Sequence, residues 1–157
     1  MVVENKSHSG GFSGLLSRLF RLERMAVYVG VPQGRASRSG AEINNAELLY
    51  IHTNGSPVRN IPARPVIEPA LKYHKEKVMT QYSKALTAAA EGDKKALNTA
   101  LIRTGLAGQN AARDWFTNPA NNWSPNSPRT IAKKGSSRPL IDTATLRKSI
   151  VYVVREE

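Results

Sequence analysis

Residues 61–90 read IPARPVIEPALKYHKEKVMTQYSKALTAAA, an entry bounded by prolines that leads into the longest helical pattern in the chain. Pro62 and Pro65 fix their own φ angles and hold the residue before each of them in an extended conformation. A proline in the first turn of a helix costs little, because its missing N–H would have no intrahelical partner. We therefore expect an extended lead-in that enters a helix at Pro65, and this helix is expected to continue without a break to Ala90.

The apolar positions of this stretch share one face of the predicted helix, because they recur at spacings of three and four. They are Ile67, Leu71, His74, Val78, Tyr82, Ala85, Leu86 and Ala89. Gly92 predicts the end of the helix, and Asp93 is a suitable N-cap for a second helix over residues 93–116. Gly105 and Gly108 make the middle of this second helix small, which indicates that another backbone comes close. The two helices are expected to form a hairpin laid against a sheet.

Two segments near the ends of the chain predict the strands of that sheet. Residues 26–31 (AVYVGV) and residues 150–154 (IVYVV) are rich in β-branched and aromatic side chains. A helical hairpin between two clear strands indicates an α+β fold with a small, mainly antiparallel sheet.

A short helix is expected between the first strand and the proline-bounded entry. Ser39 and Glu42 match the S-x-x-E capping box, which predicts a helix that stops at the Asn-Gly pair of residues 54–55. The apolar run over residues 48–53 is ambiguous by periodicity, so a strand there is the alternative.

The first 25 residues differ from the rest in composition. Residues 1–11 are small and polar, end in Gly-Gly, and are expected to form a flexible arm. Residues 12–25 predict a basic amphipathic helix that can lie on a membrane, in the groove of a partner, or on the core of its own chain, which is the favoured interpretation. Its apolar side holds Phe12, Leu15, Leu16, Leu19, and Leu22 or Phe20. Residues 26–157 are expected to form a single α+β domain.

The chain carries 23 Lys and Arg against 12 Asp and Glu, a formal net charge of +11. Such a surface attracts an anionic partner, which can be nucleic acid, an anionic lipid surface or an acidic protein. The low aromatic content of 6% argues against a base-stacking platform for single strands. No apolar run approaches the ~20 residues that a membrane span requires, so no membrane association is expected.

Residues for catalysis or metal binding are not grouped along the sequence. His8, His52 and His74 are isolated, and the absence of cysteine excludes disulfides, thiolate metal sites and a thiol nucleophile. Neither the phosphate-binding motif G-x-x-x-x-G-K-S/T nor the nucleophile motif G-x-S-x-G occurs. We therefore expect no catalytic residue, no metal and no cofactor, in a protein that is not an enzyme.

Residues 117–141 contain four prolines and no acidic residue. A loop of this length inside a compact domain is usually functional or disordered. Its cations and its tryptophan predict an extended basic segment that binds a partner. The residues expected to contact a neighbouring chain are Trp123, Arg129, Lys133, Lys134 and Arg138.

Three parts of the chain carry a family pattern. They are residues 27–31 with 46–55 (VYVGV and AELLYIHTNG), residues 61–71 (IPARPVIEPAL), and the closing segments WSPNSPRTI, KGSSRPLIDT and LRKSI within residues 123–150. Together they resemble the tail-completion, or head–tail joining, proteins of tailed bacteriophages and prophages, over roughly residues 26–154. The P-A-R-P entry and the segment P-L-I-D-T-x-x-L-R-x-S-I are the most specific parts. Ala144 departs from the pattern, since relatives often carry glycine there.

This resemblance implies a small α+β protein that forms a six- or twelvefold ring in the neck of the virion. The ring would lie between the portal-associated connector and the tail tube or terminator proteins, and DNA would pass through it without sequence-specific binding. The protein would be made in the cytoplasm of the host bacterium and would have no enzymatic activity. The alternative function is a basic module that binds nucleic acid.

The subunit interface of such a ring is expected to use side chains from three parts of the chain. Arg64, between the two prolines, is expected to pair with a carboxylate or a helix-end carbonyl, with a pair between subunits as the alternative. The predicted interface residues are Arg64, Trp123, Arg129, Lys133, Lys134, Arg138, Phe12, Leu16 and Phe20.

Overall fold

The computed structural model describes residues 11–37, 39–40, 42–141 and 144–157, so the predicted arm over residues 1–11 lies outside the described residues except for Gly11. The helices are α1 (Phe12–Glu23), α2 (Asn45–Asn54), α3 (Ile67–Tyr73), α4 (Lys75–Glu91), α5 (Lys94–Asp114), α6 (Pro128–Lys134) and α7 (Thr145–Ser149). The strands are β1 (Met25–Gly30) and β2 (Val151–Glu156). Three short 3-10 turns cover Gln33–Arg35, Pro57–Arg59 and Pro119–Asn121.

The sheet joins the two ends of the described chain. β1 and β2 pair antiparallel, in a register that runs from Met25 opposite Glu156 to Gly30 opposite Val151. Both strands lie where the β-branched segments predicted them. The expected α+β class with a small antiparallel sheet is therefore confirmed at this level.

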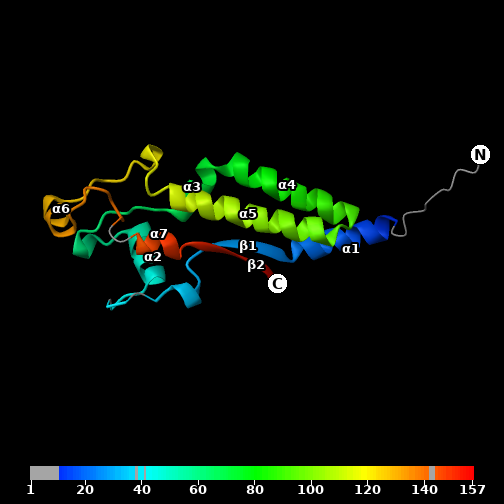
Figure 1. Ribbon diagram of the computed structural model, residues 1–157, viewed down its shortest axis with the longest axis horizontal. Helices are drawn as coiled ribbons and strands as arrows, with labels where there is room; N and C mark the ends of the chain where they lie inside the picture. Colours follow the sequence, from blue (N-terminus) through cyan, green and yellow to red (C-terminus); the bar gives the residue numbers. More distant parts are fainter. Residues whose placement is uncertain (1–10, 38, 41, 142–143) are drawn as a thin grey trace, which may run out of the picture.

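Helix α5 lies between α4 and the sheet (Figure 1). Gly92 ends α4 with a left-handed φ of 78°, and the Asp93 side chain accepts a hydrogen bond from the Ala96 N–H at 2.8 Å, as the N-cap of α5. A Cβ on Gly105 would overlap the ring of Tyr152 on β2, and one on Gly108 would lie 2.9 Å from a Val29 methyl group on β1. The small residues of α5 thus make room for side chains of the sheet, whereas the sequence had indicated another backbone.

The long helix predicted from Pro65 to Ala90 begins later and is broken. A helix that started at Pro65 would need an N–H from residue 69 on the Pro65 carbonyl, and Pro69 has none. The first helical residue is instead Ile67. The break lies at His74, with φ −97° and ψ 20°, so that α3 and α4 form two segments that both pack on α5.

The break places the side chains of Tyr73 and His74 at the C-terminal end of α5. The Tyr73 ring lies 5.4 Å from the Trp115 ring, centroid to centroid. The Nε2 atom of His74 lies 3.7 Å from a carboxylate oxygen of Asp114, which is longer than a hydrogen bond. These contacts fix the direction in which α3 leaves α4.

Residues 45–54 form helix α2, so the helix is confirmed over the alternative strand. The predicted cap at Ser39 and Glu42 is wrong. Asn44 is the N-cap and accepts from the Ala46 and Glu47 N–H groups at 2.9 and 3.0 Å, while Glu47 accepts from the Asn44 N–H at 2.8 Å. The start is shifted because Asn45, which is fully buried, donates its backbone N–H to the Ala36 carbonyl at 2.7 Å.

The core consists of two apolar clusters. One joins α2, α3, α7 and the C-terminal end of α5 through Leu49, Val66, Ala70, Ala112, Trp115, Phe116, Leu146 and Ile150. The other joins α1, α4 and the N-terminal half of α5 through Leu22, Ala85, Ala89, Ala100 and Leu101. Helix α1 therefore packs on its own chain, as favoured from the sequence. None of the helices described is long and apolar enough to cross a membrane.

Candidate functional site

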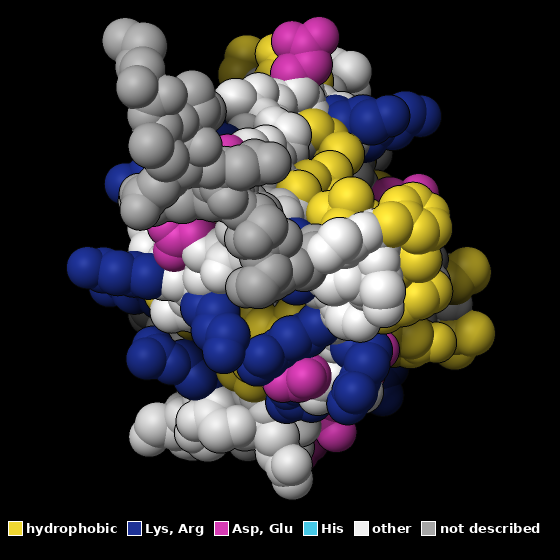
Figure 2. Space-filling view, turned by 90° about the vertical axis from the view of Figure 1, so that its right-hand side faces the viewer, with side chains coloured by type: hydrophobic (Ala, Val, Ile, Leu, Met, Phe, Trp, Pro, Cys, Tyr) yellow, Lys and Arg dark blue, Asp and Glu magenta, His cyan; other side chains and the backbone are white. Residues whose placement is uncertain are grey.

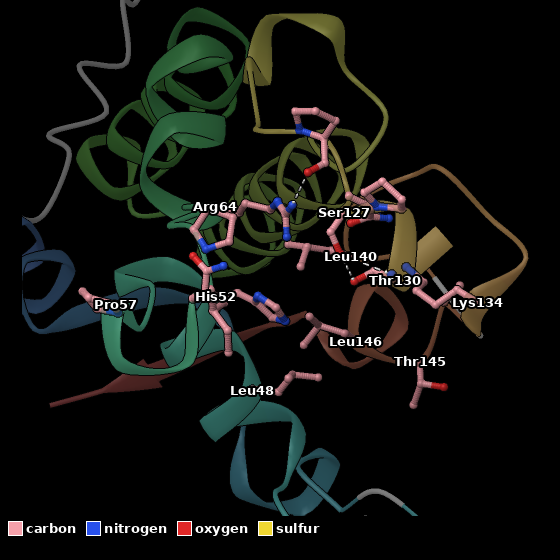
Figure 3. Close-up of a pocket in the computed structure, with 17 residues that line it drawn as sticks. Leu48, His52, Pro57, Arg64, Ser127, Thr130, Lys134, Leu140, Thr145 and Leu146 are labelled. Atoms are coloured by element: carbon pink, nitrogen blue, oxygen red, sulfur yellow. Dashed lines mark hydrogen bonds between the residues drawn. The ribbon is translucent and has the colours of Figure 1, made fainter. Parts of the chain in front are cut away.

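A cleft of about 800 Å³ is shown in Figure 3. Helices α2, α6 and α7, which contribute to its lining, lie at the end of the molecule opposite α1 (Figure 1). The walls of the cleft come from α2, the proline-bounded entry, α6 and α7. They are brought together from positions up to about 100 residues apart in the sequence. The cleft is therefore the candidate functional site.

The proline-bounded entry lies directly on the end of α2. Gly55 ends the helix with φ 73°, and a Cβ there would lie 2.8 Å from the Ala63 N atom and 2.9 Å from the Ile61 O atom. Ser56 and Ile61 form an isolated antiparallel bridge, with N···O distances of 2.8 and 2.9 Å. Glycine is thus required at position 55 for two reasons. Its backbone conformation favours glycine, and the close approach of the entry leaves no room for a Cβ atom.

Arg64 connects the entry to the segment before α6. It is only 6% exposed, and its Nε and Nη2 atoms donate to the Ser124 carbonyl at 3.1 and 2.8 Å. Nη2 also donates to the Pro125 carbonyl at 3.1 Å. Burial lowers the pKa of the Arg64 guanidinium from its usual value, but an arginine stays charged in a protein. Arg64 therefore binds backbone carbonyls of its own chain, in a loop and not at a helix end; a role between subunits stays a prediction.

Trp123 fastens the same loop to the core. Its Nε1–H donates to the Pro65 carbonyl at 3.2 Å, and its ring packs edge-on against Phe116 with centroids 5.8 Å apart. The Pro65 carbonyl is available because Pro69 has no N–H to occupy it. This contact was not predicted from the sequence. The spacing of Pro65 and Pro69 could have indicated it, because a proline four residues further on leaves the Pro65 carbonyl without an intrahelical partner.

Residues 117–141 are less extended than expected. Ser127 accepts from the Thr130 N–H at 3.2 Å and starts α6. The buried Asn126 side chain donates to the Ser137 and Arg138 carbonyls at 3.3 and 3.2 Å, and Lys134 Nζ also donates to the Arg138 carbonyl, at 3.2 Å. The segment is thus held against the domain as one wall of the cleft, with Arg129, Lys133 and Arg138 exposed on its outer side.

Helix α7 is held by an arginine that was not singled out from the sequence. Arg113 on α5 donates from Nε to the Ile150 carbonyl at 2.9 Å and from Nη2 to the Lys148 carbonyl at 3.0 Å. In the opposite direction, Arg147 Nε donates a hydrogen bond to the Arg113 carbonyl at 2.8 Å. Leu146 and Ile150 are buried in the core below. The segment LRKSI is therefore held on α5, and its Leu146 lines the cleft.

The cleft combines apolar and polar groups. Figure 3 shows the side chains arranged around the opening, with Lys134 and Thr145 on the side away from Pro57. The residues described in its lining include no Asp or Glu, and the described part of the chain contains no group of three or more His, Cys, Asp or Glu residues that could hold a metal. Leu48, Ile61 and Leu140 offer apolar contact beside polar donors, an arrangement suited to binding a segment of a partner.

The nine predicted interface residues do not form one surface. Arg64 and Lys134 line the cleft, and Trp123, Arg129, Lys133 and Arg138 belong to the adjoining loop. Phe12, Leu16 and Phe20 lie on α1, at the other end of the molecule (Figure 1). Phe12 is 77% exposed and Phe20 61% exposed, whereas Leu16 is half-buried. The structure thus divides them into two distant groups.

Lys and Arg side chains crowd the end of the molecule at α1 and the α4–α5 turn (Figure 2). Arg18, Arg21 and Lys94 line a hollow of about 220 Å³ there. Lys84, Lys95 and Arg103 line a second hollow, of about 380 Å³. The ion pairs found among the described residues, Arg24–Glu156 and His74–Asp114, involve none of these six cations. This end is therefore a strongly basic surface.

No protein-family model, curated protein or solved structure matches this chain.

Proposed function

We propose that this chain is a structural subunit of a bacteriophage neck, which assembles into a ring that joins the head connector to the tail. The single observation that supports the proposal most is the position of the three resembling segments. Residues of α2, of the proline-bounded entry and of the closing segments meet around one cleft, while residues 27–31 belong to the sheet region. Hydrogen bonds from Arg64, Trp123 and Arg113 to backbone carbonyls hold the entry, the loop and α7 in place. Residues gathered from distant parts of a chain at one surface indicate a shared role for that surface.

The two ends of the molecule support a ring. A heterologous contact joins two different surfaces and closes into a ring when the rotation between copies permits it. The cleft with its loop is one such surface, and α1 with its exposed phenylalanines is another. Aromatic and arginine side chains are those enriched in protein interfaces, and both surfaces present them.

Electron microscopy and mass photometry of the purified protein test directly whether it forms a ring. Mass spectrometry of purified virions tests whether the chain is part of the virion. Rings of uniform size and the presence of the chain in virions are expected. A protein that stays monomeric at all concentrations and is absent from particles would contradict the proposal.

A pair of neighbouring substitutions tests the cleft itself. Pro57 lines the cleft, whereas the adjacent Val58 is 99% exposed and lies outside its lining. Pro57→Arg is expected to block ring assembly by placing a long charged side chain in the opening. Val58→Arg adds the same charge on the same turn and should leave assembly unchanged. Equal behaviour of the two variants would exclude the cleft as the interface.

The basic surface at the α4–α5 turn favours a second function, the binding of nucleic acid. Its six cations form no ion pair with any described residue, and they present a surface for phosphate groups. Binding through phosphates should weaken with salt, with a log–log slope of about −0.9 for each phosphate contacted. Filter binding to duplex DNA at several salt concentrations measures this slope. Affinity that does not depend on salt would exclude this function.

A further inference from the structure

The pairing of β1 with β2 shows which backbone groups of β1 point away from the ladder. The Glu157 N–H donates to the Arg24 carbonyl at 2.7 Å, which places Arg24 and every second residue after it in hydrogen-bonded pairs. The Tyr152 N–H donates instead to the Gln109 side chain at 3.2 Å, so the pair of Tyr152 and Val29 is not hydrogen-bonded. It follows that Met25, Val27 and Val29 direct their N–H and C=O groups outward.

This outer edge of β1 is open. Nothing in the described part of the chain bonds the outward groups of Met25, Val27 or Val29. The outer edge of β2 differs, because Gln109 occupies the Tyr152 N–H and the strand ends in charged residues. Proteins protect an edge strand with charges, prolines or a covering segment, and β1 (MAVYVG) contains no charge and no proline.

The face of the sheet that points away from α5 is also partly exposed to solvent. Helix α5 packs on the face formed by residues such as Val29 and Tyr152, whereas Tyr28, on the other face, is 47% exposed. A hollow of about 260 Å³ lies on that exposed face, lined mainly by apolar side chains that include Tyr28, Val151 and Val153. A strand added to β1 would direct every second side chain to this face.

We propose that residues 1–10 of a neighbouring copy add to the open edge of β1 as a third strand. The inference rests on the proposed assembly into a ring, and it adds a second contact between copies to the one proposed between the cleft and α1. The segment contains the β-branched pair Val2 and Val3, no proline, and one Glu against one Lys, and it precedes a glycine pair that can serve as a hinge. When extended it spans roughly 33–36 Å, more than the roughly 17 Å of the five residues from Met25 to Val29.

The distance along α1 explains why the strand comes from another copy. Gly11 is separated from Met25 by a helix, which at 1.5 Å per residue places them roughly 20 Å apart. A return along α1 would use about six of the ten residues at 3.3–3.6 Å each. About four would then remain, too few to cover the five residues of the edge. Residues 1–10 can reach the β1 strand of the next copy without first returning along their own α1, so all ten are available for pairing.

Two matched proline substitutions test which edge is used. Val27 and Val154 face each other across the ladder, pack on the same helices, and both direct their N–H away from the ladder. Val27→Pro removes an outward N–H from the β1 edge, and Val154→Pro removes one from the β2 edge. Sedimentation velocity should show that Val27→Pro, and a chain that begins at Gly11, need at least about tenfold more protein to assemble. Val154→Pro should assemble like the wild type. Circular dichroism checks that each variant is folded.

A peptide experiment keeps the inference testable if Val27→Pro does not fold. A synthetic peptide of residues 1–10, added to the chain that begins at Gly11, should slow hydrogen exchange at the Val27 and Val29 amides. Unchanged exchange, or assembly of Val27→Pro at wild-type concentrations, would overturn the added strand while the ring proposal stands. If the full chain never self-assembles, the ring proposal falls as well. If Val27→Pro prevents assembly but removal of residues 1–10 does not, the occupant is another strand and the inference is wrong.

Discussion

At the scale of single residues, Ala144 has an unfavourable backbone conformation. Ala144 has φ 58° and ψ 13°, in the left-handed region, where a side chain costs roughly 1–2 kcal/mol. Glycine adopts this conformation without that cost. Ala144 is therefore a strained residue beside the cleft.

Ala144→Gly should therefore stabilise the protein. We expect a gain of about 0.5–1 kcal/mol in the free energy of unfolding, because the relief of strain exceeds the added entropy of the unfolded chain. Urea denaturation measures it. The control is Ala132→Gly within α6, where the conformation is helical and the same change should cost about 1 kcal/mol. A loss of stability in both variants would show that Ala144 is not strained.

Gly55 and Gly135 provide a matched pair for the contact at the end of α2. Both have left-handed φ angles, of 73° and 67°, but only Gly55 has atoms close to where a Cβ would lie. Gly135→Ala should cost about 1–2 kcal/mol from conformation alone. Gly55→Ala should cost about 1–3 kcal/mol more, because the Gly55 ψ of 179° lies in a region that side chains hardly adopt and because the entry must move. Thermal unfolding of the two variants compares them, and equal losses would contradict the close approach.

At the scale of elements, the position of α5 on the sheet depends on its glycines. A Cβ on Gly105 would overlap the Tyr152 ring, which cannot move without leaving the face of β2. Gly105→Ala should therefore cost about 2–4 kcal/mol, although alanine favours a helix. Gly14→Ala in α1 is the control, since nothing lies within 4 Å and a gain of up to about 1 kcal/mol is expected. Calorimetric melting temperatures distinguish the two, and a stabilised Gly105→Ala would contradict this packing.

The elements with local signals were predictable from the sequence. The β-branched strands, the left-handed Gly92 and the Asp93 cap depend on residues next to one another, and the structure has each of them as expected. The start of α2 and the break at His74 were not predictable in this way. Each depends on a tertiary contact, such as the bond from Asn45 to Ala36. The walls of the candidate site were likewise hidden, because Arg64 and its carbonyl partners are 60 residues apart.

At the scale of the whole molecule, α1 has an inner and an outer side with different roles. Leu22 is 2% exposed and belongs to the core, while Phe12 and Phe20 lie on the surface. The double substitution Phe12→Ser and Phe20→Ser should leave the free energy of unfolding within about 0.5 kcal/mol. It should nevertheless weaken assembly, because exposed aromatic side chains are typical binding residues.

Leu22→Ala is the contrasting variant for this prediction. It creates a cavity in the core and should cost about 2–5 kcal/mol of stability. Denaturant unfolding and mass photometry, applied to both variants, separate folding from association. If the phenylalanine variant is as unstable as Leu22→Ala, or assembles like the wild type, α1 has no binding side.

The pairing of β1 with β2 also has a consequence for biosynthesis. The two strands are more than 120 positions apart, so β1 leaves the ribosome long before its partner is made. The nascent polypeptide can form its helices early, but the sheet closes only after the codons of β2 have been translated. A ribosome that stops before β2 is made would release a product with both edges of β1 unpaired, and unpaired strand edges promote aggregation.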